Sequence, residues 1–380
     1  RRRHTRYISV TGVQTCALPI LLPLLLLAAA GGTLAAETPP PGAVSVADGK
    51  QLLRDCRPWV PTGLSFYGRL IPSRWDSDPD TLQARDSFGQ ANMDLVRQFG
   101  GDAVRYQIGM PFLDPKSPQY RPGYLDEVAA AVQLARRDGF VVFLSMQWQG
   151  RTRVHAVETM PGASALRAWQ AIAPRFSRDQ GVVFELFNEP DSGTRPDPQT
   201  WELWRAGHQA IIDALRSQGV PNVLLAEGLN GGRLLDGAPD LKDPLGQLIY
   251  GVHPYMRPDL SNAAGWNRYF GDFARRHVVV ATEWSHFGRM CGNASSGAVQ
   301  QLLDYLSRSG IGLLAYGAES PDSRLVSRDA QGRIDLTTFE GRACEAPNAG
   351  PGQDLKSMFT RLGQAYRSAP AAAACHLPAP

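Results

Sequence analysis

The chain has 380 residues and a formal net charge of +3. Four positive charges, on Arg1, Arg2, Arg3 and Arg6, fall in residues 1–36, which hold no acid, so removing this stretch leaves a net charge of −1. A near-neutral chain without a basic stripe excludes a nucleic-acid partner and suits an uncharged substrate.

The N-terminal stretch is interpreted as two segments outside the fold. Residues 10–20 read VTGVQTCALPI, a translation of a sequencing-library adapter, so residues 1–20 are expected to be an artefact rather than a real basic leader. Residues 21–36 hold an apolar core too short to span a bilayer and end in small residues, as a truncated signal peptide does. The protein is therefore expected to be secreted or periplasmic, without a membrane segment after cleavage. The alternative is an uncleaved membrane anchor.

The rest of the chain divides by composition. Residues 37–53 are rich in proline and small residues and are expected to form a flexible leader, residues 54–368 form one domain without a linker, and residues 369–380 form an Ala/Pro-rich tail. Strands are expected at residues 63–67, 103–108, 141–146, 182–187, 223–226, 248–253, 278–282 and 312–316. Helices are expected at residues 81–99, 124–138, 163–177, 200–217, 241–247, 263–276, 298–309 and 354–368.

Eight strand–helix units of this size predict an α/β fold, a single-domain closed (β/α)8 barrel, also called a TIM barrel. The alternative is a doubly wound open sheet, but no Gly-x-Gly-x-x-Gly follows the first predicted strand. Catalytic groups of such a barrel lie where strands end, on the loops that lead into helices.

The cysteines indicate disulfides in an exported chain. Without residues 1–20 four cysteines remain, Cys56, Cys291, Cys344 and Cys375. Of the three possible pairings we favour Cys291 with Cys344, which leaves Cys56 to join Cys375 and link the two ends of the domain. The sequence contains no Cys-x-x-Cys motif or Cys/His cluster that would suggest zinc.

Two short apolar runs each end at a glutamate. The first reads GVVFELFNEP and contains Glu189, and the second reads VVVATEW and contains Glu283. Both are typical of buried parallel strands, so the two glutamates are expected on the same rim of the barrel. Two carboxyl groups that face each other across a cleft suit the cleavage of a glycosidic bond.

Three motifs at predicted strand ends together resemble glycoside hydrolase family 5, the cellulase-like family: Asn188-Glu189-Pro190, His253-Pro254-Tyr255 and Glu283-Trp284. The match covers nearly the whole mature chain and keeps the motif order. The resemblance implies a retaining hydrolase with Glu189 as general acid/base and Glu283 as nucleophile, their carboxyl groups about 5–5.5 Å apart. It implies neither a metal nor another cofactor.

The same resemblance assigns further contacts. Arg105 is expected to touch the nucleophile, and the alternative is a structural ion pair with Glu185. Asn188 is expected to hydrogen-bond the sugar 2-hydroxyl, His253 to bind substrate and Tyr255 to orient the nucleophile.

Aromatic side chains on the rim can stack against sugar rings. Trp148 and Trp284 follow predicted strands and are candidates. Tyr316 stands where the family usually has a tryptophan, and Gln147 where it often has a histidine, which leaves the preferred sugar open. Glu227 is a rim acid without a matching motif and is interpreted as a substrate-side or structural residue.

The sequence thus predicts an exported, monomeric endo-β-1,4-glucanase that binds an oligo- or polysaccharide and works by double displacement. A β-mannanase and an exo-acting β-glycosidase of the same fold are alternatives. Two other classes are further alternatives: a non-catalytic glycan-binding barrel, which does not need an acid–nucleophile pair, and a metal-dependent barrel hydrolase, for which no ligand cluster is evident.

Overall fold

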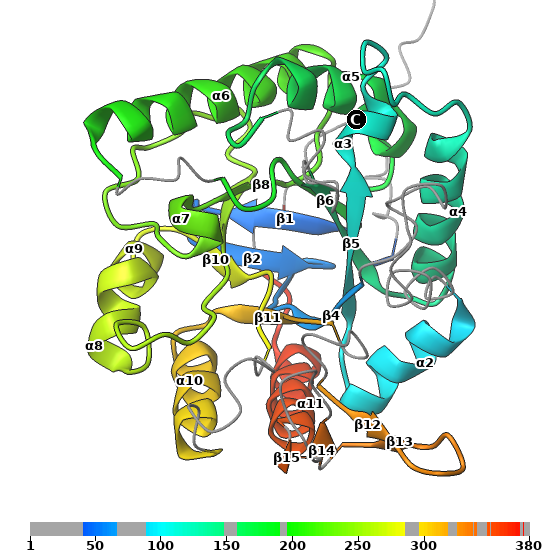
Figure 1. Ribbon diagram of the computed structural model, residues 1–380, viewed down its shortest axis with the longest axis vertical. Helices are drawn as coiled ribbons and strands as arrows, with labels where there is room; N and C mark the ends of the chain where they lie inside the picture. Colours follow the sequence, from blue (N-terminus) through cyan, green and yellow to red (C-terminus); the bar gives the residue numbers. More distant parts are fainter. Residues whose placement is uncertain are drawn as a thin grey trace, which may run out of the picture. The chain divides into compact units, whose positions relative to one another are not determined.

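The computed structural model describes residues 41–66, 89–147, 158–190, 196–285, 296–317, 325–336, 338–339, 348–349, 351–372 and 375. Eight parallel strands close into a barrel in the order β10-β11-β4-β5-β6-β7-β8-β9, which confirms the predicted fold (Figure 1). The strands are β4 (Thr62–Phe66), β5 (Ala103–Gly109), β6 (Val141–Gln147), β7 (Val182–Glu185), β8 (Leu224–Glu227), β9 (Leu248–Val252), β10 (Val279–Ala281) and β11 (Gly312–Tyr316).

Helices surround the strands, as Figure 1 shows. The longer ones are α2 (Gln90–Phe99), α4 (Tyr124–Arg137), α5 (Ala163–Phe176), α6 (Pro198–Ser217), α10 (Ser296–Arg308) and α11 (Gly352–Ser368). Short elements lie in the connections: α3 (Met110–Leu113), α7 (Leu229–Gly232), β12 (Ser327–Arg328), β13 (Ile334–Asp335), β14 (Thr338–Phe339) and β15 (Asn348–Ala349). No helix in the described ranges is both long and apolar enough to cross a bilayer.

Two predicted helices differ from the structure. Residues 241–247 are not helical, because Pro244 lacks an N–H and Gly246 takes a left-handed conformation with φ 64°. Residues 263–276 form α8 (Ala263–Trp266), a π-helical turn η3 (Asn267–Gly271) and α9 (Asp272–Ala274) instead of one continuous helix. A Cβ on Gly271 would lie 1.8 Å from the Tyr305 hydroxyl, so this turn packs too closely against α10 to carry a side chain there.

The inner face of the barrel changes from apolar to polar along the strands. Near the strand starts it is filled by apolar side chains: Ala103, Val141, Phe143, Val183, Leu225, Ile249, Val280 and Leu314. Two residues further along β5, β7 and β8 stand Arg105, Glu185 and Glu227, all with no exposed surface. The apolar layer stabilises the barrel, and the polar layer supports the rim where the strands end.

The predicted flexible leader is wrong for its second half. β1 (Val44–Ala47), β2 (Gln51–Arg54) and β3 (Arg57–Pro58) form an antiparallel sheet. This sheet covers the N-terminal end of the barrel. The N–H of Val44 donates to the carbonyl of Gln180 at 3.0 Å, and the N–H of Val46 donates to Gln247 Oε1 at 2.8 Å. Composition concealed the short strand β1, in which Val44, Ser45 and Val46 are all buried.

One predicted disulfide is present. Cys56 is bonded to Cys375, and the N–H of Ala372 donates to the carbonyl of Cys56 at 2.7 Å, so the tail is tied to the N-terminal sheet. Cys291 and Cys344 lie outside the described residues, as do residues 1–36, for which an artefact and a signal segment were predicted.

Replacing Cys56 and Cys375 together by serine is expected to lower the free energy of unfolding by about 2–4 kcal/mol, because the bridge restricts an unfolded chain across 319 residues. The kcat/KM for a soluble substrate is expected to stay unchanged, since the bridge lies beside the N-terminal sheet, at the end of the barrel where the strands begin. Guanidinium denaturation of wild type and variant, each with and without reductant, checks this. An unchanged unfolding midpoint would contradict it.

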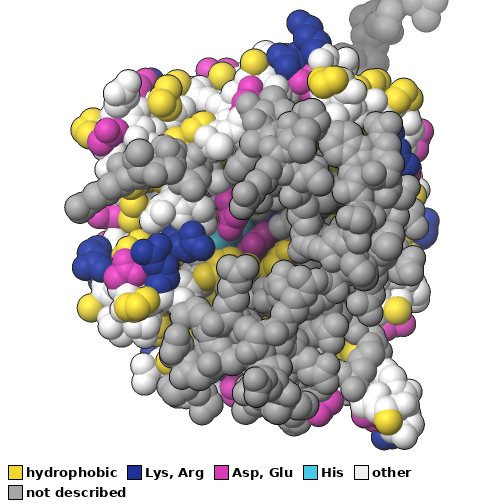
Figure 2. All heavy atoms as spheres, viewed as in Figure 1, with side chains coloured by type: hydrophobic (Ala, Val, Ile, Leu, Met, Phe, Trp, Pro, Cys, Tyr) yellow, Lys and Arg dark blue, Asp and Glu magenta, His cyan; other side chains and the backbone are white. Residues whose placement is uncertain are grey.

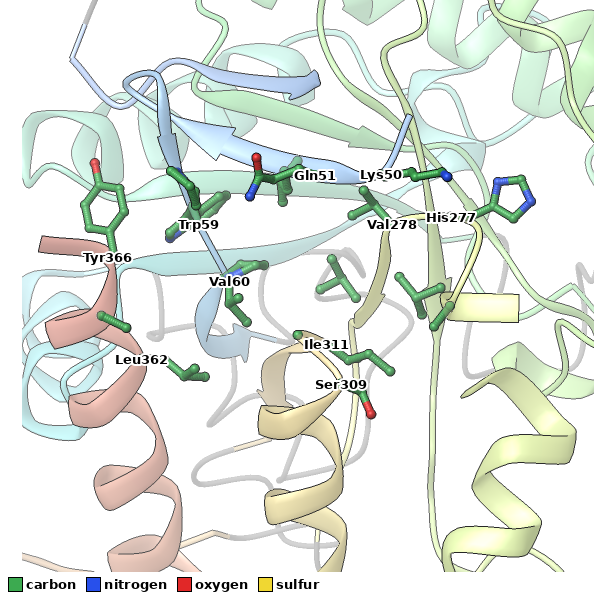
Figure 3. Close-up of a pocket in the computed structure, with 18 of the residues that line it drawn as sticks. Lys50, Gln51, Trp59, Val60, His277, Val278, Ser309, Ile311, Leu362 and Tyr366 are labelled. Carbon is green, nitrogen blue, oxygen red and sulfur yellow. The ribbon is translucent and has the colours of Figure 1, made fainter. Parts of the chain in front are cut away.

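A cavity of about 320 Å³ also lies at the end of the barrel where the strands begin, between the N-terminal sheet, α10 and α11. Figure 3 shows Trp59, Val278, Ile311 and Leu362 around it. Its lining contains no Asp or Glu, so it cannot provide two catalytic carboxyl groups.

Candidate active site

Glu283 follows β10 and is held by three described side chains. Its Oε1 accepts hydrogen bonds from Arg105 Nη1 and Gln107 Nε2, both at 2.5 Å. Its Oε2 accepts one from the Tyr255 hydroxyl at 2.9 Å. Burial raises the pKa of Tyr255, so this hydroxyl keeps the proton that it donates. The carboxyl group of Glu283 is therefore fixed in position and only 5% of the residue surface is exposed.

Glu189 lies opposite, on the loop after β7. A carboxylate oxygen of Glu189, one of Glu283 and a ring nitrogen of His253 all lie within 4.8 Å of one another. This separation is close to that of retaining glycosidases and well below the roughly 6.5–9.5 Å of inverting ones. The Glu189 side chain is 25% exposed, so it faces the mouth, while Glu283 lies deeper. Figure 2 shows acidic and histidine side chains gathered at the middle of this face.

Arg105 connects the polar layer to the rim. Its guanidinium donates to both oxygens of Glu185, at 2.7 and 2.6 Å, as well as to Glu283. Arg105 thus contacts Glu283 and also forms the ion pair with Glu185 that was the alternative expected from the sequence, whereas the role of Glu283 as nucleophile stays a prediction. Ser65 and Ser145 also accept hydrogen bonds from it, at 3.1 and 2.8 Å.

Asn188 is 1% exposed, and its Oδ1 accepts a hydrogen bond from Arg105 Nη2 at 2.7 Å. Because a guanidinium only donates, the amide oxygen of Asn188 must face it. Any bond from Asn188 to a sugar hydroxyl is then made by its amide nitrogen.

His253 stands between three carboxyl groups. Nδ1 lies 3.0 Å from Glu189 Oε1 and 3.6 Å from Glu283 Oε2. Nε2 lies against Glu227 Oε1, as an ion-pair contact rather than an aligned hydrogen bond. Burial lowers the pKa of His253, but the negative charges of Glu227 and Glu283 outweigh burial and raise it to about 10.

The same charges shift the pKa values of two carboxyl groups in opposite directions. Burial raises the pKa of Glu283, but the positive charges of His253 and Arg105 and the bonds from Arg105 and Tyr255 outweigh burial and hold the pKa below its ordinary value. Burial and the neighbouring Glu227 raise the pKa of Glu185 to about 7 in spite of Arg105. Glu283 is thus kept ionised, as a nucleophile must be.

The cluster holds more carboxyl groups than cations, namely Glu185, Glu189, Glu227 and Glu283 against Arg105 and His253. With every group ionised its net charge would be −2. A proton retained by one carboxyl group reduces this repulsion, in line with the raised pKa of Glu185.

Two sets of side chains have the spacing of metal ligands, Glu185–Glu227–His253 and Glu189–His253–Glu283. In the first set Arg105 Nη2 lies 2.6 Å from Glu185 and 3.8 Å from Glu227, so a cation is already built in. In the second, Glu283 Oε1 already receives two N–H donors. Both sets therefore fit a hydrogen-bonded cluster better than a metal centre.

The aromatic residues predicted to stack against sugar differ in their exposure to solvent. Trp284 has no exposed surface, which does not match an open stacking platform, and its role stays a prediction. Tyr316 is half-buried, and its backbone N–H donates to the carbonyl of Trp284 at 2.8 Å. Trp148 lies outside the described residues.

Sequence reasoning missed Gln107 and left Glu227 open between a substrate-side and a structural role. Gln107 follows Arg105 by two positions on β5, so both side chains point into the barrel, and that spacing was the available signal. Glu227 is completely buried among side chains rather than placed on the substrate side.

Comparison with known proteins places the chain among glycosidases. A family model described as Cellulase (glycosyl hydrolase family 5) matches residues 81–320. Endoglucanase C of Evansella cellulosilytica is 22% identical over 278 residues, which cover 64% of this chain and 31% of that protein, so the chain spans about a third of it. A probable endo-β-1,4-glucanase B of Aspergillus oryzae is 22% identical over 268 residues, covering 65% of this chain and 76% of the relative.

Solved structures share the fold. The catalytic domain of endoglucanase Cel5A of Thermobifida fusca has a TM-score of 0.59 and 17% identity, and the match covers 84% of this chain and 97% of that one. A β-glucanase of Saccharophagus degradans, solved with cellotetraose, has a TM-score of 0.61 and 18% identity over 84% of this chain and 94% of the other. At such identities the likeness shows the fold alone.

Proposed function

The chain belongs to glycosyl hydrolase family 5, and we propose that it is an O-glycosyl hydrolase, a retaining endo-β-1,4-glucanase with Glu283 as nucleophile and Glu189 as acid/base. The observation that carries the proposal is the approach of the two carboxyl groups to within 4.8 Å, with Glu283 held ionised. That combination supplies an anion and a proton donor on either side of one anomeric centre.

In the first step Glu283 attacks the anomeric carbon while Glu189 gives its proton to the leaving oxygen. Oε1 of Glu283 is saturated by two donors, so the attacking lone pair comes from Oε2, which Tyr255 orients. The glycosidic bond breaks, its electron pair stays on the leaving oxygen, and a covalent glycosyl–Glu283 ester forms.

In the second step Glu189, now ionised, takes a proton from water. The water oxygen attacks the anomeric carbon, the ester bond breaks, and Glu283 leaves as a carboxylate. His253 lies 3.0 Å from Glu189 and 3.6 Å from Glu283, so it contacts both groups as the charge moves between them.

The names of the relatives support β-1,4-glucan as the substrate, since they are endoglucanases. The experiment is a panel of carboxymethyl cellulose, β-mannan, xylan and β-1,3-glucan, assayed for reducing ends and for loss of viscosity. An endo-glucanase is expected to act on cellulose derivatives and to lower viscosity early. Faster turnover of mannan, or release of sugar without loss of viscosity, would favour the mannanase or exo-acting alternative.

We also propose that the enzyme works as a monomer outside the cytoplasm. The Cys56–Cys375 disulfide supports an oxidising compartment. The apolar segment at 21–36 supports export.

A further inference from the structure

Glu227, the last residue of β8, is completely buried and contacts Glu189 and His253. Its Oε2 accepts the backbone N–H of Glu189. Its Oε1 accepts the Thr282 hydroxyl at 3.1 Å and faces His253 Nε2. The barrel leaves room for this side chain, because a Cβ on the neighbouring Gly251 would lie 3.0 Å from Glu227 Cγ.

The partners of Glu227 fix its role as an acceptor. The Glu189 amide and the Thr282 hydroxyl both donate to it, and His253 Nε2 faces it in an ion-pair contact. With Nε2 turned to Glu227, the ring presents Nδ1 to Glu189 Oε1. Glu227 therefore contacts Glu189 twice, once through its backbone and once through the imidazole.

The backbone of Glu189 needs such support. Its φ of 50° lies in the left-handed region, which costs free energy for a residue with a side chain. A charge-assisted hydrogen bond to the N–H of that same residue opposes relaxation of the loop. Relaxation would move the carboxyl group that has to reach the leaving oxygen.

We propose that Glu227 is a positioning residue for general-acid catalysis, which holds Glu189 and the His253 ring in the geometry that delivers the proton. The inference rests on the proposed roles of Glu189 and Glu283. The hydrogen bonds of the two buried acids differ. Glu227 accepts the backbone N–H of Glu189, whereas Glu185 accepts from Arg105, which also donates to Glu283; Glu227 lies 3.8 Å from Arg105.

Leaving-group dependence distinguishes the roles of the two buried acids. For aryl β-cellobiosides, kcat/KM reports the glycosylation step, and a leaving group as acidic as 2,4-dinitrophenolate departs without a proton, whereas phenolate needs one. Glu227→Gln is expected to lower kcat/KM about 10- to 100-fold for the phenyl substrate and by less than about 3-fold for the dinitrophenyl substrate. The loss on the phenyl substrate is smaller than the full effect of general-acid catalysis, because the acid itself remains. Glu185→Gln, as matched control, is expected to lower kcat/KM for both substrates alike.

Thr282→Val provides a second variant in case Glu227→Gln does not fold. It removes one donor to Glu227 Oε1 and is expected to give a smaller loss with the same preference for the acidic leaving group. Equal losses on both substrates for Glu227→Gln, or for Thr282→Val where only that variant folds, would overturn the positioning role. Full activity of Glu283→Gln would instead remove the proposed function itself, so the two failures are distinct.

Discussion

Replacing Glu283 by glutamine is expected to lower kcat on an aryl β-cellobioside by roughly 10⁴-fold or more, because the amide cannot form the glycosyl ester. The change keeps the size of the side chain, and its oxygen can still accept the bonds from Arg105 and Gln107. Folding should therefore survive. In wild type, a 2-deoxy-2-fluoro cellobioside with an activated leaving group is expected to accumulate as an ester on the peptide that contains Glu283, detected by mass spectrometry.

Glu202→Gln is the matched control for this substitution. Glu202 is an exposed residue of α6, paired with Arg205 on the same helix, so the variant should keep wild-type kcat. Equal turnover by wild type and Glu283→Gln would mean that the activity does not arise from this site, and would favour the reading as a glycan-binding barrel.

The largest effect on stability is expected from Arg105→Met. This guanidinium has no exposed surface and pairs with the carboxyl groups of Glu185 and Glu283, so its removal takes away the cation that offsets these two buried charges. The free energy of unfolding is expected to fall by about 3–5 kcal/mol near neutral pH. Chemical denaturation monitored by tryptophan fluorescence measures it.

The sign of the pH dependence follows from Glu185. In the folded protein the pKa of Glu185 is about 7, above the ordinary value. Its contribution to the free energy of unfolding is therefore fully present below that ordinary value and is lost as pH rises through 7. Without Arg105 the pKa of this group rises further, and the loss extends to higher pH. The destabilisation by Arg105→Met should therefore be smaller at about pH 5 than at about pH 8. A penalty independent of pH would contradict the ion-pair explanation.

Arg105→Lys is the control for charge alone. Lysine keeps the positive charge but lacks the planar fork that reaches both oxygens of Glu185 and also Glu283. It is expected to lose less stability than the methionine variant while still losing activity. Equal stability losses in the two variants would show that packing rather than charge dominates.

The strands could be predicted because each is an apolar run bounded by turn residues, and the barrel then follows from their number and alternation with helices. The convergence of Glu189 and Glu283 followed from topology, since parallel strands end on one rim. Neither inference needed side-chain detail.

The contacts below the rim could not be predicted in the same way. Whether Arg105 meets Glu185, Glu283 or both depends on the reach of one long side chain inside the barrel. Glu227 ends β8 at the rim, where a buried acceptor and a substrate contact have the same sequence position. The N-terminal sheet was hidden because two four-residue strands give a weak periodic signal beside a proline-rich composition.

The Cys56–Cys375 link has a consequence for how the enzyme can be extended. Both ends of the described domain meet beside the antiparallel sheet, behind the barrel floor, while the carboxyl groups open on the other side. A carbohydrate-binding module or an affinity handle joined at either end would emerge away from the catalytic mouth and leave it unobstructed for a long polymer. The same proximity makes the domain a suitable scaffold for circular permutation, with new termini placed in a surface loop.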